Sequence, residues 1–328
     1  MGRRFLVTGG AGYVGSHLVA ALLDRGDAVI VLDNLRTGHR AAVPPAARLI
    51  TGDLANGAAI EDAMRLGPYD AVFHFASLSQ VGESMRMPMR YLLDNAANGI
   101  RLIDACVRHS VGRFVLSSTA ALFNVASDDP IPEEAHVDPQ SAYGDSKWMI
   151  ERALRWAAQV HGLRYACLRY FNAAGADPAG RLGEDHRPES HLIPLVIDAA
   201  LGRSPALDVY GDDYPTPDGT CIRDYVHVSD LATAHLLAFE RMADDSVVWN
   251  LGNGAGHSVR QVIASVERVS GLRVPYRIVG RRPGDAAVLV ASSQRAQQAG
   301  WRPVLGELDE IVRTAFVWRE RHPHGYGD

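Results

Sequence analysis

The chain alternates short apolar runs with longer stretches in which apolar residues recur at intervals of three or four positions. The short runs predict buried strands at residues 4–8, 28–32, 48–51, 71–75, 113–119 and 165–170. The longer stretches predict helices that follow residue 12, span 58–65 and 89–109, and begin near residue 143. Because strands and helices alternate, the strands should run parallel, with right-handed crossovers between them. The pattern therefore predicts an α/β fold with a doubly wound parallel sheet.

The pattern changes character after residue 175. Residues 177–188 and 212–220 are rich in Gly, Pro and Asp, which favour turns and loops. An α/β pattern then resumes at 226–252 and should return to the first sheet. The expected domains are a first one at residues 1–175 with 226–252, and a smaller α/β domain from residues 176–225 and 253–328.

Composition and charge exclude several classes of protein. The chain has 328 residues and a net charge of −5 without runs of like charge, so it lacks the electrostatic footprint of a nucleic-acid-binding protein. No apolar run approaches the ~20 residues that cross a bilayer, and the first residues do not resemble a signal peptide. Its three cysteines are too few and too dispersed for disulfides or a zinc site, so we expect a cytoplasmic protein without a metal site.

A glycine-rich turn joins the first predicted strand to the first predicted helix. Gly9, Gly12 and Gly15 lack Cβ atoms, so a pyrophosphate can approach the backbone and the N–H groups at the helix start. The second strand ends in Asp33, where a carboxylate can meet the ribose hydroxyls of a dinucleotide and disfavour a 2′-phosphate. Asp33 can also be a simple turn residue before Asn34.

A second motif lies at the start of the helix near residue 143. Tyr143 and Lys147 are four residues apart and therefore share a helix face. A cationic neighbour favours the phenolate, so this spacing indicates a base that can accept a hydroxyl proton, although ordinary amphipathic helices also contain it. Thr119 ends a predicted strand at the same sheet edge and can bind the same hydroxyl, or can cap a turn instead.

Eight motifs together resemble the extended short-chain dehydrogenases/reductases and, within them, the UDP-glucose 4-epimerase family. They lie at residues 7–17, 32–35, 81–84, 143–147, 168–172, 210–220, 222–228 and 281–285. The resemblance implies a Rossmann fold, a tightly held NAD cofactor, a UDP-sugar substrate and a homodimer. It also implies that UDP-glucose and UDP-galactose are interconverted by C4 oxidation, rotation of the 4-keto sugar and re-reduction.

The family resemblance also implies the role of each matching residue. Tyr143 takes the proton of the sugar 4-hydroxyl, Thr119 bonds the same oxygen, and Lys147 holds the ribose and, with the cationic nicotinamide ring, lowers the pKa of Tyr143. Arg223 and Arg282 supply charge to the two phosphates. The implied cofactor contacts are Gly9, Gly12, Tyr13, Val14, Gly15, Asp33, Asn34, Leu35, Arg36, Thr37, Gly38, Asp53, Leu54, Phe75, Ala76, Ser77, Leu78, Ser79, Asn95, Lys147 and Phe171. The implied substrate contacts are Thr119, Tyr143, Asn172, His191, Leu192, Asp208, Val209, Tyr210, Arg223, Arg282, Asp285 and Leu289.

The residues also bear on three alternative functions. A sugar-nucleotide 4,6-dehydratase needs an acid and a base directly after Thr119, and Ala120 and Ala121 are neither. A 4-epimerase of UDP-N-acetylhexosamine or of UDP-xylose and UDP-arabinose has nearly the same motifs and remains an alternative. A non-catalytic NAD sensor of this fold would normally lack Tyr143 or Lys147, and both are present.

Overall fold

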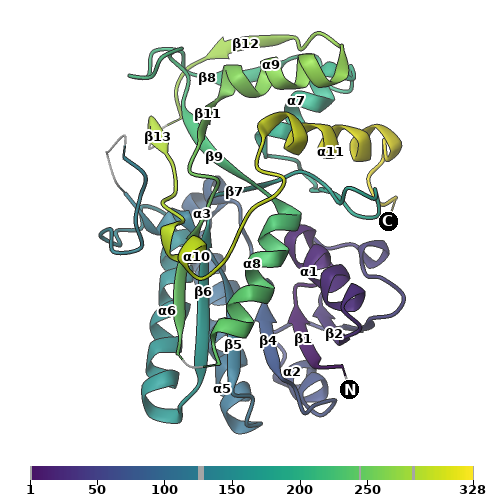
Figure 1. Ribbon diagram of the computed structural model, residues 1–328, viewed down its shortest axis with the longest axis vertical. Coiled ribbons are helices and arrows are strands. Elements are labelled where there is room, and N and C mark those ends of the chain that lie inside the picture. The colour runs from purple at the N-terminus through teal and green to yellow at the C-terminus, as the bar shows by residue number, and fades with distance from the viewer. Residues whose placement is uncertain (1, 125–128, 244, 283–284, 328) are drawn as a thin grey trace.

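The computed structural model describes residues 2–124, 129–243, 245–282 and 285–327. Its largest sheet is parallel and, within these residues, has seven strands in the order β10-β6-β5-β4-β1-β2-β3 (Figure 1). These strands are β1 (Arg4–Thr8), β2 (Ala28–Asp33), β3 (Arg48–Thr51), β4 (Ala71–His74), β5 (Arg113–Thr119), β6 (Arg164–Tyr170) and β10 (Val247–Leu251). The predicted α/β fold with a doubly wound parallel sheet is confirmed.

Helices cover both faces of this sheet because successive strand residues point to opposite sides. Phe5 and Val7 pack in the apolar layer beneath helices α1 (Tyr13–Asp24) and α8 (Val228–Arg241). Leu6 points the other way, into the layer beneath three further helices. These are α2 (Gly57–Met64), α5 (Asn98–Arg108) and α6 (Ala142–His161).

The remaining elements form a second group, at the top of Figure 1, beyond the carboxyl ends of the large sheet. A four-stranded sheet joins β7 (Asn172–Ala174), β9 (Ile222–His227), β11 (Gly256–Ser258) and β13 (Val288–Leu289), and a strand pair joins β8 (Leu207–Tyr210) and β12 (Tyr276–Val279). Their helices are α7 (Leu192–Ala200), α9 (Val259–Ser270) and α11 (Leu308–Arg321), whereas the short α10 (Gln294–Gln298) packs against β10 of the large sheet. An apolar cluster packs α7, α9 and α11 together. No helix in the described ranges has the length and apolar character that a membrane crossing requires.

The predicted helix at residues 89–109 differs from the structure. After α3 (Val81–Arg86), the chain forms α4 (Pro88–Tyr91), a π-helical turn (Leu92–Ala97) and then α5. A π-helical turn holds one residue more than an α-helical turn, and the apolar period does not reveal it. Within this turn Asn95 is fully buried.

Candidate active site

The turn between β1 and α1 needs glycine at its first position. Gly9 has φ +74°, and a Cβ there would lie 2.4 Å from the backbone nitrogen of Ala76. Gly12 precedes α1 as its N-cap, and no described side chain caps the helix there. The first N–H groups of α1 therefore stay available to an anion, which is the arrangement that a dinucleotide pyrophosphate requires.

Asp33, at the end of β2, is tied to the glycine turn. Its carboxylate accepts hydrogen bonds from the backbone N–H of Ala11 at 3.0 Å and of Leu35 at 2.9 Å. Burial raises the pKa of Asp33, and these two N–H groups oppose the increase. Asp33 is thus fixed beside the glycine turn, and its contact with a ribose stays a prediction.

The loop after β2 is held by polar contacts of the predicted cofactor residues Asn34 and Arg36. Asn34 donates to Asp53 at 2.8 Å, and Arg36 lies 3.1 Å from a carboxylate oxygen of Asp94. Other predicted cofactor residues follow strand ends of the same sheet edge. Val14 and Gly15 instead lie in the first turn of α1. The connections after the strand ends contain Thr37, Gly38, Leu54, Phe75, Ala76, Ser77, Leu78, Ser79 and Phe171.

Two predicted cofactor residues have side chains that bind protein groups instead. The Tyr13 hydroxyl donates to the carbonyl oxygen of Gly175 at 2.6 Å, which leaves its backbone N–H at the start of α1 for a phosphate. The Asn95 amide accepts from Leu78 N at 2.8 Å, donates to Leu78 O at 2.9 Å and donates to Ser146 Oγ at 3.1 Å. Asn95 therefore supports the loop after β4, and its contact with the cofactor stays a prediction.

Helix α6 places the predicted catalytic tyrosine against the end of β5. Ser141 caps the helix by accepting a hydrogen bond from Gly144 N at 3.1 Å. A Cβ at Gly144 would lie 2.2 Å from the carbonyl oxygen of Ala121, so glycine permits this close approach. As a result, Tyr143 lies beside Thr119, whose hydroxyl acts to lower the pKa of the phenol. The pair predicted to act on one hydroxyl is thus brought together.

Lys147 lies one turn further along α6 and is almost completely buried. Its Nζ donates to the carbonyl oxygen of Ser117 at 2.8 Å. Burial lowers the pKa of Lys147 to about 7, while the carboxylate of Glu151 acts in the opposite direction. The Ser117 hydroxyl in turn hydrogen-bonds the hydroxyl of Tyr170.

The expectation that Lys147, together with the cationic nicotinamide ring, lowers the pKa of Tyr143 stays a prediction. In the protein itself, burial raises the pKa of Tyr143, and the neighbouring hydroxyl of Thr119 opposes that increase. The ammonium group of Lys147 points to the carbonyl oxygen of Ser117 and is itself desolvated.

Sequence reasoning missed a buried ion pair behind this site. Glu151 accepts from Arg169 at 3.0 Å and 2.6 Å and from the Ser118 hydroxyl at 2.6 Å. Glu151 is four residues after Lys147, and this regular spacing was the available signal. The pair fixes α6 against β5 and β6, and hence fixes Tyr143 and Lys147.

The predicted substrate residues lie mostly in the second group of elements. Arg223 and Asp285 form an ion pair at 3.2 Å, and Leu289 pairs with Arg223 in the strand register. The guanidinium of Arg282 lies 3.8 Å from the ring centre of Tyr210. Pro283 and Gly284 of the same motif lie outside the described residues.

Three further substrate candidates have side chains bound to the protein. Asn172 donates to Asp224 O at 2.9 Å, and His191 hydrogen-bonds Glu184 just before Leu192 begins α7. The side chain of Asp208 is bound by Arg277 at 2.6 Å. Val209 is buried in the apolar core, so of its atoms only the backbone can reach a ligand.

A half-buried tyrosine and a buried lysine one helical turn apart, in a sheet that also carries a dinucleotide-type turn, are the catalytic arrangement of short-chain dehydrogenases/reductases, and the fold and the site define this class. The model of the NAD-dependent epimerase/dehydratase family matches residues 5–252. The chain therefore belongs to that family, as the resemblance predicted, and its cofactor is NAD.

Relatives with assigned activities match along nearly the whole chain. A UDP-glucose 4-epimerase of Halalkalibacterium halodurans is 47% identical over 324 residues, which are 98% of this chain and 97% of that protein. The structure of UDP-glucose 4-epimerase from Brucella ovis in complex with NAD has a TM-score of 0.93 at 44% identity, covering 96% of this chain and 98% of that one. The Bifidobacterium longum enzyme in complex with NAD⁺ and UDP has a TM-score of 0.93 at 35% identity, with coverages of 98% and 99%.

Proposed function

We propose that this protein interconverts UDP-glucose and UDP-galactose by epimerisation at C4 of the sugar. The observation that carries the proposal is the placement of Tyr143 beside Thr119, with Ala120 and Ala121 next in the chain. A base and a hydroxyl for the sugar 4-oxygen are present, and the following residues offer no acid or base for the elimination of water.

The residues of the chain divide the work as follows. When bound, NAD supplies the reversible acceptor for the C4 hydride. Tyr143 takes the proton of the 4-hydroxyl group and returns it after the 4-keto sugar has rotated to present its other face. Thr119 orients that oxygen. The guanidinium groups of Arg223 and Arg282 attract the UDP diphosphate, because arginine matches phosphate oxygens in charge and geometry.

The direct test is to incubate the purified protein with UDP-galactose, without added cofactor, and to resolve the products. Formation of UDP-glucose with NAD recovered from the denatured protein is the expected result. A requirement for NADPH would contradict both the proposed reaction and the role of Asp33. Binding of UDP-sugar without any conversion would indicate a sensor, and conversion of other UDP-sugars alone would indicate the alternative epimerases.

We further infer that the protein forms a homodimer through α6 and the neighbouring helical segment. Large apolar side chains are exposed there, including Met89 (64%), Leu93 (62%), Trp156 (62%) and Val160 (65%). Trp156 and Val160 are four residues apart on α6, which packs beside α4, the π-helical turn and α5. Such a patch favours association with a second copy of the chain.

Light scattering after size-exclusion chromatography tests this dimer. Trp156→Glu combined with Val160→Lys should yield monomers. The matched control is Val304→Lys, which changes an exposed valine (80%) outside the helical patch and should leave the dimer intact. An unchanged mass for the double variant would rule out this interface.

A cytoplasmic location is also part of the proposal. Cys106, Cys167 and Cys221 are all free thiols, which is usual for proteins of a reducing compartment. Cell fractionation with an antibody to the protein would test it.

A further inference from the structure

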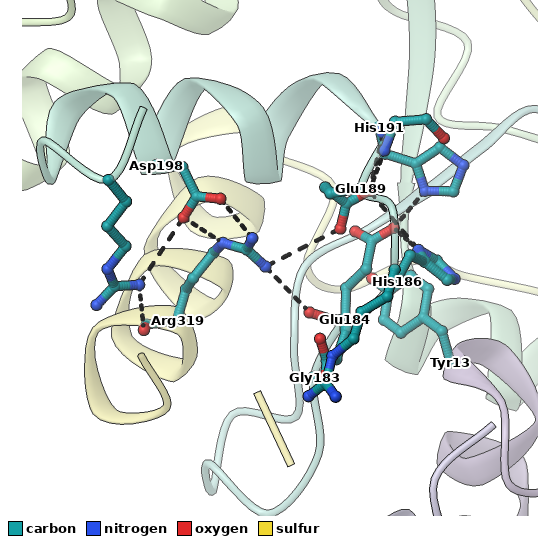
Figure 2. A network of polar contacts seen from close by, with 12 residues as sticks. Tyr13, Gly183, Glu184, His186, Glu189, His191, Asp198 and Arg319 are labelled. Carbon is teal, nitrogen blue, oxygen red and sulfur yellow. Dashed lines mark hydrogen bonds and ion pairs between the residues drawn. The ribbon is translucent and has the colours of Figure 1, made fainter. Parts of the chain in front are cut away.

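The loop between β7 and α7 gathers two carboxylates and two imidazoles at one point. Glu184, His186, Glu189 and His191 follow one another in the pattern Glu-x-His-x-x-Glu-x-His. Figure 2 shows their side chains turned toward one another. One donor atom from each residue lies within 4.8 Å of the other three.

Glu184 stands at the centre of this group. Its Oε1 atom lies 3.2 Å from Nδ1 of His186 and hydrogen-bonds Nδ1 of His191. The two imidazole rings are nearly perpendicular, with centres 5.1 Å apart. The Nδ1 atoms of His186 and His191 are therefore both directed at the carboxylate of Glu184, from two sides.

Glu189 completes the group, and one of its carboxylate oxygens has no hydrogen-bond partner among the described residues. Its Oε1 accepts from the backbone N–H of Ser190 at 2.7 Å and of His191 at 2.9 Å, and lies 3.7 Å from His186 Nδ1. Its side chain is only 8% exposed, and its Oε2 is buried without a hydrogen bond from any described residue. A buried carboxylate oxygen left in this way is costly.

Arg319 forms a long ion pair with that oxygen but does not hydrogen-bond it. Its Nη1 atom lies 3.9 Å from Glu189 Oε2, beyond hydrogen-bonding distance. Its guanidinium is directed to Asp198, to which Nε donates at 2.7 Å. Glu184 is likewise only 7% exposed, so two buried carboxylates face this one point.

We propose that Glu184, His186, Glu189 and His191 bind one divalent transition-metal ion of the zinc class. Imidazole nitrogen and carboxylate oxygen are ligands of zinc, whereas calcium and magnesium prefer sites made of oxygen alone. With metal–ligand distances of ~2.1 Å, neighbouring donors around a tetrahedral ion lie ~3.4 Å apart. The donors need only small side-chain rotations to reach this spacing, and two carboxylates balance the charge of the ion.

The position of the group assigns the ion a structural role. The His186 ring packs against the ring of Tyr13 at the start of α1, with centres 6.2 Å apart. His191 is the N-cap residue of α7. The ion therefore ties the loop to the beginnings of two helices, one from each group of elements, and stabilises this connection without taking part in the reaction.

Metal analysis of the full-length, NAD-containing protein tests the site. The protein is treated with a chelator, dialysed and titrated with Zn²⁺ alone, with calorimetry and elemental analysis as readouts. We expect about one ion per chain and a higher Tm when it is bound. Co²⁺ in place of Zn²⁺ should show the intense visible absorption of a four-coordinate site, a readout independent of activity.

Variants locate the ion. Glu189→Gln keeps the shape and the Oε1 acceptor, and His186→Gln removes a ring ligand; each should weaken zinc binding about 100-fold or more. His161→Gln, an exposed histidine at the end of α6, is the matched control and should bind zinc like the parent. Equal affinity of parent and site variants would overturn the proposal, as would a parent that binds no zinc or gives only the weak absorption of six-coordinate cobalt. NAD content and Tm without metal show that each variant is folded.

Discussion

Lys147 Nζ donates a hydrogen bond to the carbonyl oxygen of Ser117 at 2.8 Å, and two residues later the same strand supplies Thr119 to Tyr143. The end of β5 thus positions both functional side chains of α6, those of Lys147 and Tyr143. The amine is held by a backbone carbonyl, and the phenol lies beside a hydroxyl. The two groups are positioned together but are tuned by different neighbours.

Replacing Tyr143 with Phe should separate chemistry from binding. The change removes only the hydroxyl, so turnover should fall by ~10²–10⁴-fold or more while NAD stays bound. The measurements are kcat with UDP-galactose and the NAD content of the purified variant. A turnover near that of the parent would refute the role of Tyr143 as the base.

Thr119 should set the pH at which Tyr143 becomes active. The pKa of Tyr143 is raised by burial and lowered by the neighbouring hydroxyl of Thr119, so Thr119→Val should raise it further. Because the deprotonated form is the base, the ascending limb of kcat against pH should move to higher pH. Thr119→Ser keeps the hydroxyl and is the control. If the ascending limb of Thr119→Val stays in place or moves to lower pH, Thr119 does not lower the pKa of Tyr143.

Gly9 should be indispensable for nucleotide binding. Gly9→Ala places a Cβ 2.4 Å from Ala76 N at φ +74°, so the turn must distort and purified protein should lose most of its NAD. Gly57→Ala is the control, because a Cβ at Gly57 has nothing within 4 Å. Absorbance and enzymatic assay of the released nucleotide measure the content. Full NAD occupancy in Gly9→Ala would show that the turn tolerates a side chain.

The buried pair of Glu151 and Arg169 should contribute strongly to stability. Glu151→Gln leaves the guanidinium buried without its counter-charge, which should lower the free energy of unfolding by about 3–5 kcal/mol. Asp62→Asn breaks an ion pair with Arg65 whose side chains are 64% and 68% exposed, and should cost ~1 kcal/mol or less. Denaturant unfolding of both variants at equal NAD saturation provides the comparison. Equal losses would mean that burial does not strengthen the effect of breaking the pair.

Much of the sheet could be predicted because apolar runs and turn residues mark its strands. β1 and β3 begin and end where the pattern places them. The Tyr143 helix and the glycine turn were likewise visible, since their chemistry depends on residues close in sequence. The π-helical turn at Leu92–Ala97 was not, because its extra residue leaves the apolar period nearly unchanged.

Long-range polar contacts could not be predicted from the sequence, for a different reason. Glu151 and Arg169 come from separate elements, and a charged residue in a sequence is normally assigned to the surface. The sign of the Tyr143 pKa shift depends on its burial, which only the packing of α6 reveals. The group around Glu184 lies on a loop without periodicity, so His191 alone was noticed, and for another role.

The last prediction concerns the size of the sugar and rests on Leu289. The resemblance to the epimerases implies that this position lines the sugar pocket beside C2, where tyrosine would go with rejection of N-acetyl sugars and cysteine or serine with their acceptance. Here Leu289 is half-buried against a cluster with Phe123 and Phe171, and it pairs with Arg223 in the strand register. Its position therefore depends on β9 and on the ion pair of Arg223 with Asp285.

Leucine is intermediate in volume and offers no hydrogen bond to an acetamido group, which would lose water at a cost of ~1–3 kcal/mol. We therefore expect kcat/KM for UDP-N-acetylgalactosamine to be ~10–200-fold below that for UDP-galactose. Leu289→Ser should narrow this ratio by adding space and a hydroxyl, and Leu289→Tyr should widen it. Leu272→Ser, at an exposed leucine after α9, should leave the ratio unchanged. Equal efficiency on both sugars in the parent, or one ratio across all the variants, would show that Leu289 does not select the sugar.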